Sequence, residues 1–135
     1  MGPQGVVYAQ DVQQEMLSAI SRRVQREGLV NVRPILGRGS DPRLPAGALD
    51  AVLLVDAYHE IDDRVTLLRN IAAALKPQGR IGVIDFKPNG GGGPGPDADE
   101  RVSPDVVEGD ALRAGLRLVA SETFLPYQYF LIFAR

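Results

Sequence analysis

Residues 49–86, LDAVLLVDAYHEIDDRVTLLRNIAAALKPQGRIGVIDF, decide the fold of this chain. Two short apolar runs, at residues 51–55 and 81–84, flank a longer segment whose apolar residues recur at helical spacing, with Asp62 or Asp63 as its cap. The pattern predicts a buried strand, a helix and a second buried strand. Because a strand returns parallel to its predecessor only through such a crossover, this segment predicts a parallel sheet.

The residues before this unit predict one more strand, helix and strand. We expect a strand over residues 6–10 and an amphipathic helix that starts at Val12 and ends at Gly28. A short strand over residues 29–36 follows, and Pro34 within it is typical of an edge strand. The fold class that these elements predict is α/β.

The residues after this unit predict a loop, a helix and a hairpin. Residues 87–102 are so rich in Gly and Pro that we expect a flexible surface loop without a packed element. Ser103 followed by proline starts a helix, and two β-rich runs over residues 116–134 are separated by hairpin spacing. A chain of 135 residues is long enough for one domain, so we expect a single domain over residues 1–135.

The composition narrows the functions that this chain can have. Hydrophobic residues make up 44% and charged residues 24%, as in a soluble globular protein, and the net charge of −2 with dispersed Lys and Arg argues against a nucleic-acid partner. With no cysteine and one histidine, the sequence predicts no disulfide and no dedicated metal site, and it fits a cytoplasmic protein. Its apolar runs are shorter than the roughly 20 residues of a membrane-spanning helix, and no signal peptide is visible.

Ligands of open α/β sheets bind beyond the carboxyl ends of the parallel strands, so the residues that end the strands are the candidate site. Asp11 ends the first strand, where its carboxylate can accept two hydrogen bonds from the hydroxyls of a ribose or cap the helix that follows. Residues 37–41 form a small polar loop that can border an adenine ring or serve as an ordinary turn.

A second polar group, DAYHE at residues 56–60, follows a buried strand directly. It places an acid, a phenol and an imidazole at the mouth of the crevice, in a position that suits substrate orientation or proton transfer. The alternative for His59 is a hydrogen-bonded structural residue. Asp85, near the end of the next strand, is expected to form an ion pair or anchor a loop.

Four segments together resemble class I S-adenosylmethionine-dependent methyltransferases of the small-molecule branch. They are VVYAQD at residues 6–11, the Leu-Pro-x-Gly-x-x-Asp pattern at residues 44–50, DAYHEI at residues 56–61, and LRNIAAALKPQGRIGVIDF at residues 68–86. Their order and spacing cover nearly the whole chain, and the terminal hairpin completes the likeness. The resemblance implies a Rossmann-like three-layer sheet of order 3-2-1-4-5-7-6, mostly parallel, with an antiparallel seventh strand.

The resemblance also implies a cofactor site for S-adenosylmethionine. Carried over by position, Asp11 and the adjacent Val12 correspond to the residues that hold the cofactor ribose. Gly39, Ser40 and Asp41 correspond to the loop on the adenine side, although many family members have Asp where this chain has Ser40.

Three further residues correspond to the reacting end of the family's site. Asp56 falls where the family meets the methionine part of the cofactor. Tyr58 and His59 fall beside the substrate, and we expect them to align the acceptor or to remove its proton. The predicted function is therefore methyl transfer to a small-molecule acceptor. Two alternatives stay open: a nicotinamide-dependent dehydrogenase, and a non-catalytic fragment or interaction module of the same fold.

One departure from the family concerns the start of the sheet. The family's first strand, its Asp-x-Gly-x-Gly turn and its first helix have no counterpart in this sequence, which predicts a domain truncated before its second strand. The second and fourth strands then each expose an unpaired edge. We expect these edges to close onto one another, to be filled by another chain, including a homo-oligomer partner, or to leave the chain weakly stable.

Overall fold

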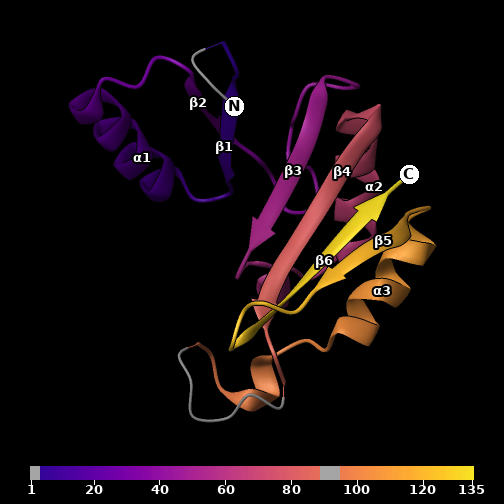
Figure 1. The fold of residues 1–135 in the computed structure, drawn as a ribbon. Helices are drawn as coiled ribbons and strands as arrows, with labels where there is room; N and C mark the ends of the chain where they lie inside the picture. The colour runs from indigo at the N-terminus through magenta and orange to yellow at the C-terminus, as the bar shows by residue number, and fades with distance from the viewer. Residues whose placement is uncertain (1–3, 89–94) are drawn as a thin grey trace.

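The structure, a computed structural model, describes residues 4–88 and 95–135 (Figure 1). Strands and helices alternate along most of the chain, which ends in two strands. The elements are β1 (Val7–Asp11), α1 (Gln14–Glu27), β2 (Val32–Leu36), β3 (Leu49–Val55), η1 (Tyr58–Glu60), α2 (Arg64–Ala74), β4 (Leu75–Phe86), η2 (Ala98–Glu100), α3 (Pro104–Arg113), β5 (Arg117–Glu122) and β6 (Gln128–Ala134), where η1 and η2 are single 3₁₀ turns.

The described strands form two sheets. In the first, β1 and β2 pair in parallel, with Val7 opposite Val32 and Asp11 opposite Leu36. The second has the order β3-β4-β6-β5, in which β3 is parallel to β4 and β6 is antiparallel to both of its neighbours. The predicted α/β class, the parallel βαβ unit and the C-terminal hairpin are therefore confirmed.

The two sheets are separate, because no described strand lies between β1 and β3. β1 lies on the side of its sheet that is nearer to β3, so the strands follow the expected order with one position open (Figure 1). Among the described residues, the edges of β1 and β3 do not close onto one another. The first of the three outcomes expected for these edges is thus wrong.

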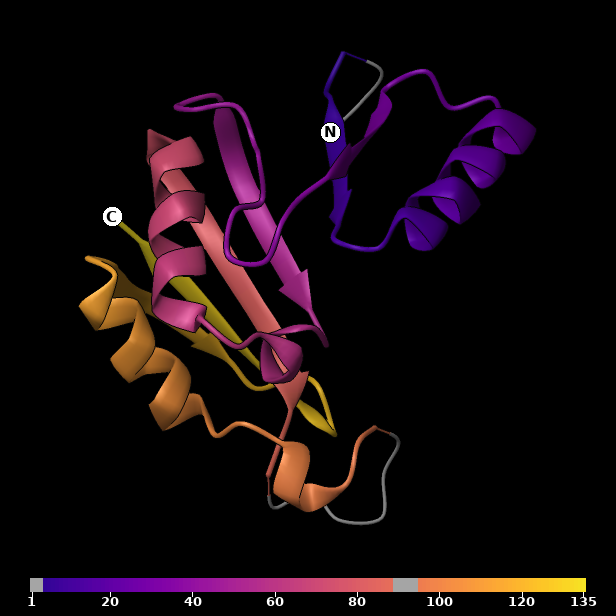
Figure 2. The same ribbon diagram turned by 180° about the vertical axis from the view of Figure 1, so that it is seen from behind.

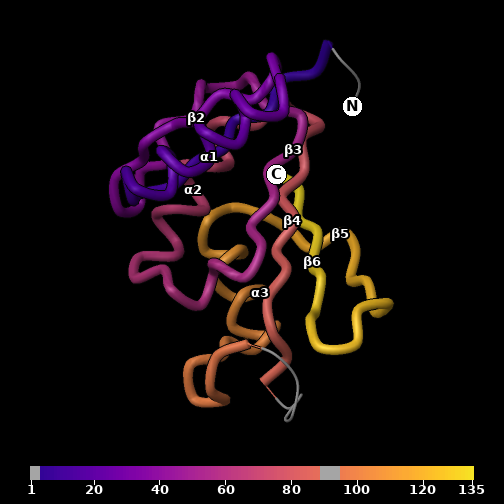
Figure 3. The backbone as a smooth tube through the Cα atoms, turned by 90° about the vertical axis from the view of Figure 1, so that its left-hand side faces the viewer, coloured from indigo at the N-terminus to yellow at the C-terminus, as the bar shows by residue number. Residues whose placement is uncertain are grey.

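The core lies between the four-stranded sheet and helices α2 and α3, which cover the same face of that sheet (Figures 2 and 3). Alternate residues of β4 and β6, such as Ile81 and Val83 or Leu131 and Phe133, point into this layer, because successive side chains of a strand point to opposite faces. Helix α1 packs instead on β1 and β2. The largest fully buried apolar side chains are Tyr58, Phe133, Leu68, Ile71, Leu75, Ile81, Val83 and Val107.

Three helix ends agree with the local sequence signals. Gly28 ends α1 in the left-handed conformation at a φ of 67°, which glycine adopts without steric cost. Asp63 caps α2 by accepting a hydrogen bond from Thr66 N at 3.3 Å, and Ser103 caps α3. None of the helices in the described part of the chain is long and apolar enough to cross a membrane.

Strand β4 begins earlier than predicted. We expected a strand from Arg80, because Pro77 and Gly79 indicate a turn after a helix. In the structure α2 ends at Ala74, and Leu75 already pairs with Leu49 before a shift of register. A Cβ on Gly79 would lie 2.9 Å from Leu75 Cδ2 and 3.1 Å from the Leu49 carbonyl oxygen, so a side chain here would crowd the two strands where glycine does not.

The described part of the region after β4 contains one short turn and one arginine with several contacts. Residues 89–94 of the expected flexible loop lie outside the described residues. In the rest, Ala98–Glu100 form a 3₁₀ turn, and the Arg101 guanidinium donates hydrogen bonds to the carbonyl oxygens of Pro96 and Lys87 at 2.9 and 3.0 Å. The η2 turn buries none of its residues, and the expectation of a flexible loop over residues 87–102 stays a prediction.

Candidate functional site

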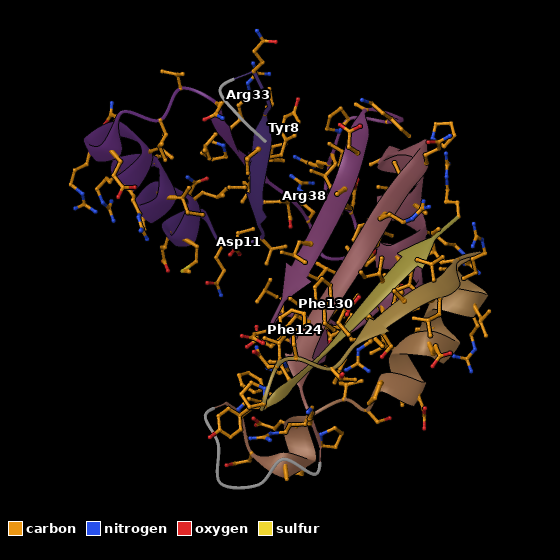
Figure 4. All side chains as sticks on the ribbon, in the orientation of Figure 1. Tyr8, Asp11, Arg33, Arg38, Phe124 and Phe130 are labelled. Carbon is orange, nitrogen blue, oxygen red and sulfur yellow. The ribbon has the colours of Figure 1, made fainter. Side chains whose placement is uncertain are left out.

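A cavity of about 1070 Å³, here called the central cavity, lies between the two sheets. Strands β1 and β3 run in the same direction, so their carboxyl ends meet at one end of it (Figure 4). Its polar lining includes Asp11, Gln13, Ser40, Glu60, Asp62 and Asp63, and its apolar lining includes Val12, Leu49, Val52, Leu54, Leu67 and Ile71. The cavity thus combines an acidic end with apolar walls.

Asp11 lies at the carboxyl end of β1 and lines the central cavity, as Val12 does. Its Oδ1 accepts a hydrogen bond from Gln13 N at 3.0 Å, which shapes the turn into α1. Within the described residues, its Oδ2 has no hydrogen-bond partner. One oxygen therefore serves the turn, as in the helix-cap alternative, and the other is available to a ligand hydroxyl.

The loop after β2 brings only part of the predicted adenine-side group to the cavity. Gly39 and Ser40 line it, and Gly39 has a φ of 49° with open space around its α-carbon. The Ser40 carbonyl oxygen accepts a hydrogen bond from Asn70 Nδ2 of α2 at 2.8 Å, which holds the loop in place. Asp41 is exposed outside the cavity lining, and its carboxylate accepts a hydrogen bond from Arg43 N at 2.9 Å.

Asp56 directly follows β3 and adopts the left-handed conformation, with a φ of 55°. Few residues other than glycine adopt this conformation, although aspartate is among those that tolerate it best. Its Oδ1 accepts a hydrogen bond from Gln128 Nε2 at 2.6 Å, which ties the end of β3 to the start of β6. Asp56 is not part of the cavity lining, so its described contacts are structural.

Tyr58 belongs to the core. Its side chain is fully buried, and its hydroxyl donates a hydrogen bond to Asp110 Oδ2 of α3 at 2.6 Å. Burial, together with the hydrogen bond and the negative charge of Asp110, raises the pKa of the Tyr58 phenol well above its ordinary value. The expectation that Tyr58 lies at the mouth of the crevice does not agree with this placement, because the η1 turn directs the ring towards α3.

The raised pKa of Tyr58 predicts a loss of stability in alkali. The folded state favours the neutral phenol, so this stabilisation is complete below the ordinary tyrosine pKa of about 10 and is lost as the pH rises above it. We expect the free energy of unfolding to fall between pH 9 and pH 11 by about 1.4 kcal/mol more in the unmodified chain than in Tyr58→Phe. Urea unfolding at both pH values measures this difference, and equal losses would contradict it.

His59 forms a buried pair with Asp85. Its Nδ1 lies 3.0 Å from both carboxylate oxygens of Asp85, which is itself fully buried. Asp85 also accepts hydrogen bonds from the backbone N–H groups of His59 and Phe86, at 3.0 and 2.8 Å. Asp85 therefore anchors the segment after β3, as expected. Because a carboxylate only accepts hydrogen bonds, Nδ1 of His59 donates to Asp85, and in the neutral ring Nε2 is then the hydrogen-bond acceptor.

A second cavity of about 780 Å³, here called the outer cavity, adjoins His59. Its lining includes His59, Glu60 and Arg64 on one side and Arg101, Ser103 and Val106 on the other. Glu60 also lines the central cavity, so the two cavities meet at this residue. Tertiary contacts thus bring an imidazole, two guanidinium groups and three acidic side chains, those of Glu60, Asp99 and Glu100, to a place beside the predicted cofactor site.

Three residues that shape this region carry no local signal in the sequence. Asn70 holds Ser40, Gln128 holds Asp56, and Arg64 donates a hydrogen bond to the His59 carbonyl oxygen at 3.4 Å. Asn70 and Gln128 lie 30 and 72 positions away from the residues they bond, and Arg64 occupies a polar position of a helix. The hydrophobic periodicity of the sequence therefore does not mark any of the three as a site residue. Within residues 4–88 and 95–135, no group of acidic and histidine side chains is arranged to hold a metal ion.

The chain matches known proteins over both sheets. Residues 1–79 match a family model described as a methyltransferase domain. A nocamycin O-methyltransferase of Saccharothrix syringae is 34% identical over 83 residues, which are 62% of this chain and 30% of that protein. The chain therefore spans about a third of the length of this curated relative.

Solved structures extend the match to the remaining residues. A SAM-dependent methyltransferase from Aquifex aeolicus superposes with a TM-score of 0.92 at 26% identity, covering 98% of this chain and 70% of that one. NcsB1, an O-methyltransferase from neocarzinostatin biosynthesis, superposes with a TM-score of 0.75 at 25% identity, covering 96% of this chain and 41% of its own. NcsB1 was solved with S-adenosylmethionine and 2-hydroxy-5-methyl naphthoic acid.

Proposed function

This chain belongs to the methyltransferase domain family, and from that membership we propose that it takes part in methyl transfer from S-adenosylmethionine to a small-molecule acceptor. The observation that carries the proposal is the central cavity, which brings Asp11, Val12, Gly39 and Ser40 together at the carboxyl ends of the strands. Its neighbour NcsB1 binds this cofactor together with an aromatic acid. The dehydrogenase alternative has no support among the proteins that the chain resembles.

The residues of the central cavity fit the parts of this cofactor. The free Oδ2 of Asp11 is an acceptor for the ribose hydroxyls, and the open space at Gly39 leaves room for a flat ring beside Val12. When bound, the cofactor supplies a methyl group already activated by its positive sulfur. The task of the chain is then to align the acceptor atom with that methyl group. In this proposal Asp41 and Asp56 support the neighbouring loops rather than touching the cofactor.

We assign the acceptor to the outer cavity and proton removal to His59. Asp85 fixes Nδ1 at 3.0 Å, so in the neutral ring it is Nε2 that can accept a proton. A hydroxyl acceptor loses its proton as its oxygen gains the methyl group, and an oriented imidazole can take that proton.

Replacing Asp11 by asparagine tests the cofactor site. Asparagine keeps an oxygen that can accept from Gln13 N but removes the charge. We expect the affinity for S-adenosylhomocysteine to fall about 10- to 100-fold, because a hydrogen bond to a charged group contributes roughly 1.5–3 kcal/mol. Isothermal titration calorimetry measures the affinity, and Asp105→Asn in α3 serves as the matched control because Asp105 is exposed and is not part of the cavity lining.

The same titration separates the alternatives. A chain that binds a nicotinamide dinucleotide in place of S-adenosylhomocysteine would indicate a dehydrogenase. A folded chain that binds neither would indicate a non-catalytic module. If the Asp11→Asn variant and the unmodified chain bind S-adenosylhomocysteine with equal affinity, Asp11 does not contact the cofactor.

The composition of the chain bears on its cellular location and on the kind of partner it binds. We place the protein in the cytoplasm, in line with the absence of cysteine from its sequence. A net charge of −2 with dispersed basic residues supports a small-molecule partner rather than a nucleic acid.

A further inference from the structure

A tight turn over residues 38–41 carries its tip to the central cavity. Arg38 N donates a hydrogen bond to Asp41 O at 2.8 Å, and Asp41 N donates one to Arg38 O at 2.7 Å. The two residues between them, Gly39 and Ser40, line the cavity. Gly39 has a φ of 49°, in the left-handed region that the first middle residue of a two-residue hairpin turn adopts. The turn is therefore held closed by its own backbone.

The base of this turn is joined to Asp11, the candidate ribose residue. Gly37 N donates a hydrogen bond to Asp11 O at 2.9 Å. A Cβ on Gly37 would lie 3.0 Å from Asp41 O and closer still to the amide nitrogen of the Gln10 side chain, so a side chain here would crowd the base of the turn. Gln10 and Asp11 both line the central cavity. The turn and the end of β1 thus form one continuous wall of that cavity.

Asn70 of α2 contacts this wall at the tip of the turn. The segment between β2 and β3 runs beside α2 (Figure 2), and Asn70 Nδ2 donates a hydrogen bond to Ser40 O at 2.8 Å. A backbone carbonyl only accepts hydrogen bonds, so the NH₂ group of Asn70 faces it. Leu67, one helical turn before Asn70, lines the opposite wall of the cavity together with Ile71. One hydrogen bond therefore links the two walls at the tip of the turn.

The later part of the same segment is held by backbone groups instead. Gly47 N and Ala48 N donate hydrogen bonds to the carbonyl oxygens of Ala73 and Ala74, each at 3.0 Å. These bonds fix the approach to β3, and Gly47 lies seven positions after Ser40 in the chain. They do not reach the turn, so the place of its tip relative to α2 depends on the Asn70 side chain.

We propose that Asn70 is a positioning residue of the cofactor site, which holds the turn over residues 38–41, through Ser40 O, in the place from which the turn contacts S-adenosylmethionine. Asn70 is not part of the cavity lining, so it acts through Ser40 and does not touch the ligand. The identity of the ligand rests on the proposed function. The hold of Asn70 on the turn does not, and the two are measured separately.

Replacing Asn70 by leucine removes the donor and keeps a side chain of similar size. We expect the amides of Arg38 and Asp41 to exchange hydrogen at least about 3-fold faster, because the turn loses its support and opens more often. We expect the affinity for S-adenosylhomocysteine to fall about 3- to 10-fold, which corresponds to the loss of one neutral hydrogen bond. Hydrogen exchange resolved by residue with NMR and isothermal titration calorimetry measure the two effects.

Two further variants make the test specific. Asn70→Asp keeps the shape but turns an acceptor towards Ser40 O, so we expect losses at least as large as in Asn70→Leu. Arg69→Leu is the matched control on the same helix, because it also removes a hydrogen bond, from Arg69 Nη2 to Arg113 O at 3.0 Å, but one that leads to α3. We expect its turn amides and its affinity to stay within about 2-fold of those of the unmodified chain, even where its stability falls.

Each result either supports or overturns the role of Asn70. The proposal is overturned if both Asn70 variants leave the turn amides unchanged, or if Arg69→Leu speeds their exchange equally. It is also overturned if the turn amides exchange faster while the affinity for S-adenosylhomocysteine stays the same. If the unmodified chain does not bind S-adenosylhomocysteine, the proposed function fails, and the exchange of the Arg38 and Asp41 amides alone decides whether Asn70 holds the turn.

Discussion

Replacing Asp85 by alanine is expected to lower the free energy of unfolding by about 3–5 kcal/mol, the largest effect of any single polar substitution in the described chain. Asp85 is fully buried and accepts hydrogen bonds from two backbone N–H groups and from the ring of His59. Alanine leaves all three donors without their carboxylate partner at a position that is fully buried in the unmodified chain. Urea unfolding followed by circular dichroism measures the loss.

The control for this prediction is Asp97→Ala. Asp97 is exposed and its side chain forms no hydrogen bond as the cap of η2, so we expect a change below about 0.5 kcal/mol. A loss of similar size in both variants would contradict the role given to Asp85. We expect the loss of unfolding free energy in Asp85→Asn to lie between those of the two alanine variants. Asparagine keeps one acceptor oxygen, but its NH₂ group then faces other donors.

Replacing His59 by asparagine is expected to lower the turnover of a phenolic acceptor by about 10²–10⁴-fold, the range for a positioned acid–base group. Asparagine can still donate a hydrogen bond to Asp85, but it cannot take a proton. We expect the affinity for S-adenosylhomocysteine to change less than about 2-fold, since His59 lines the outer cavity and not the central one. Transfer of a labelled methyl group to a panel of hydroxylated aromatic acids measures the turnover.

A comparison of acceptors separates catalysis by His59 from a structural role. An acceptor whose reacting oxygen is already ionised at the assay pH needs no base, so we expect the loss in His59→Asn to fall below about 10-fold for it. A structural defect would lower the turnover of both acceptors equally. Equal losses would therefore assign His59 to the anchoring of η1 alone.

Much of the fold could be predicted because its signals are local. The periodicity of residues 49–86 and the caps Asp63 and Ser103 depend on neighbours within a few positions, and the structure confirms them. The rule that ligands bind at the carboxyl ends of parallel strands selected Asp11 and Ser40, which the structure places in one cavity. The predicted start of β4 at Arg80 was wrong, because the strand begins where Leu75 pairs with Leu49, a residue far away in the chain.

The roles of the candidate site residues could be predicted only in part. The segment DAYHE was correctly placed after a strand, but its side chains form hydrogen bonds with different parts of the chain. Asp56 bonds to Gln128, Tyr58 to Asp110 and His59 to Asp85. These partners lie 72, 52 and 26 positions away in the chain. No local pattern contains such pairings, because they depend on how helices and strands pack.

The sequence by itself determined the α/β class, the order of the elements and the strand ends that form the candidate site, since periodicity, caps and turns act over short distances. Only the tertiary structure decided which of those side chains remain free for a ligand. It buried Tyr58 against Asp110, fixed His59 on Asp85, and left the edges of β1 and β3 facing each other. The physical reason is that burial and hydrogen-bond partners depend on the packed arrangement of distant elements.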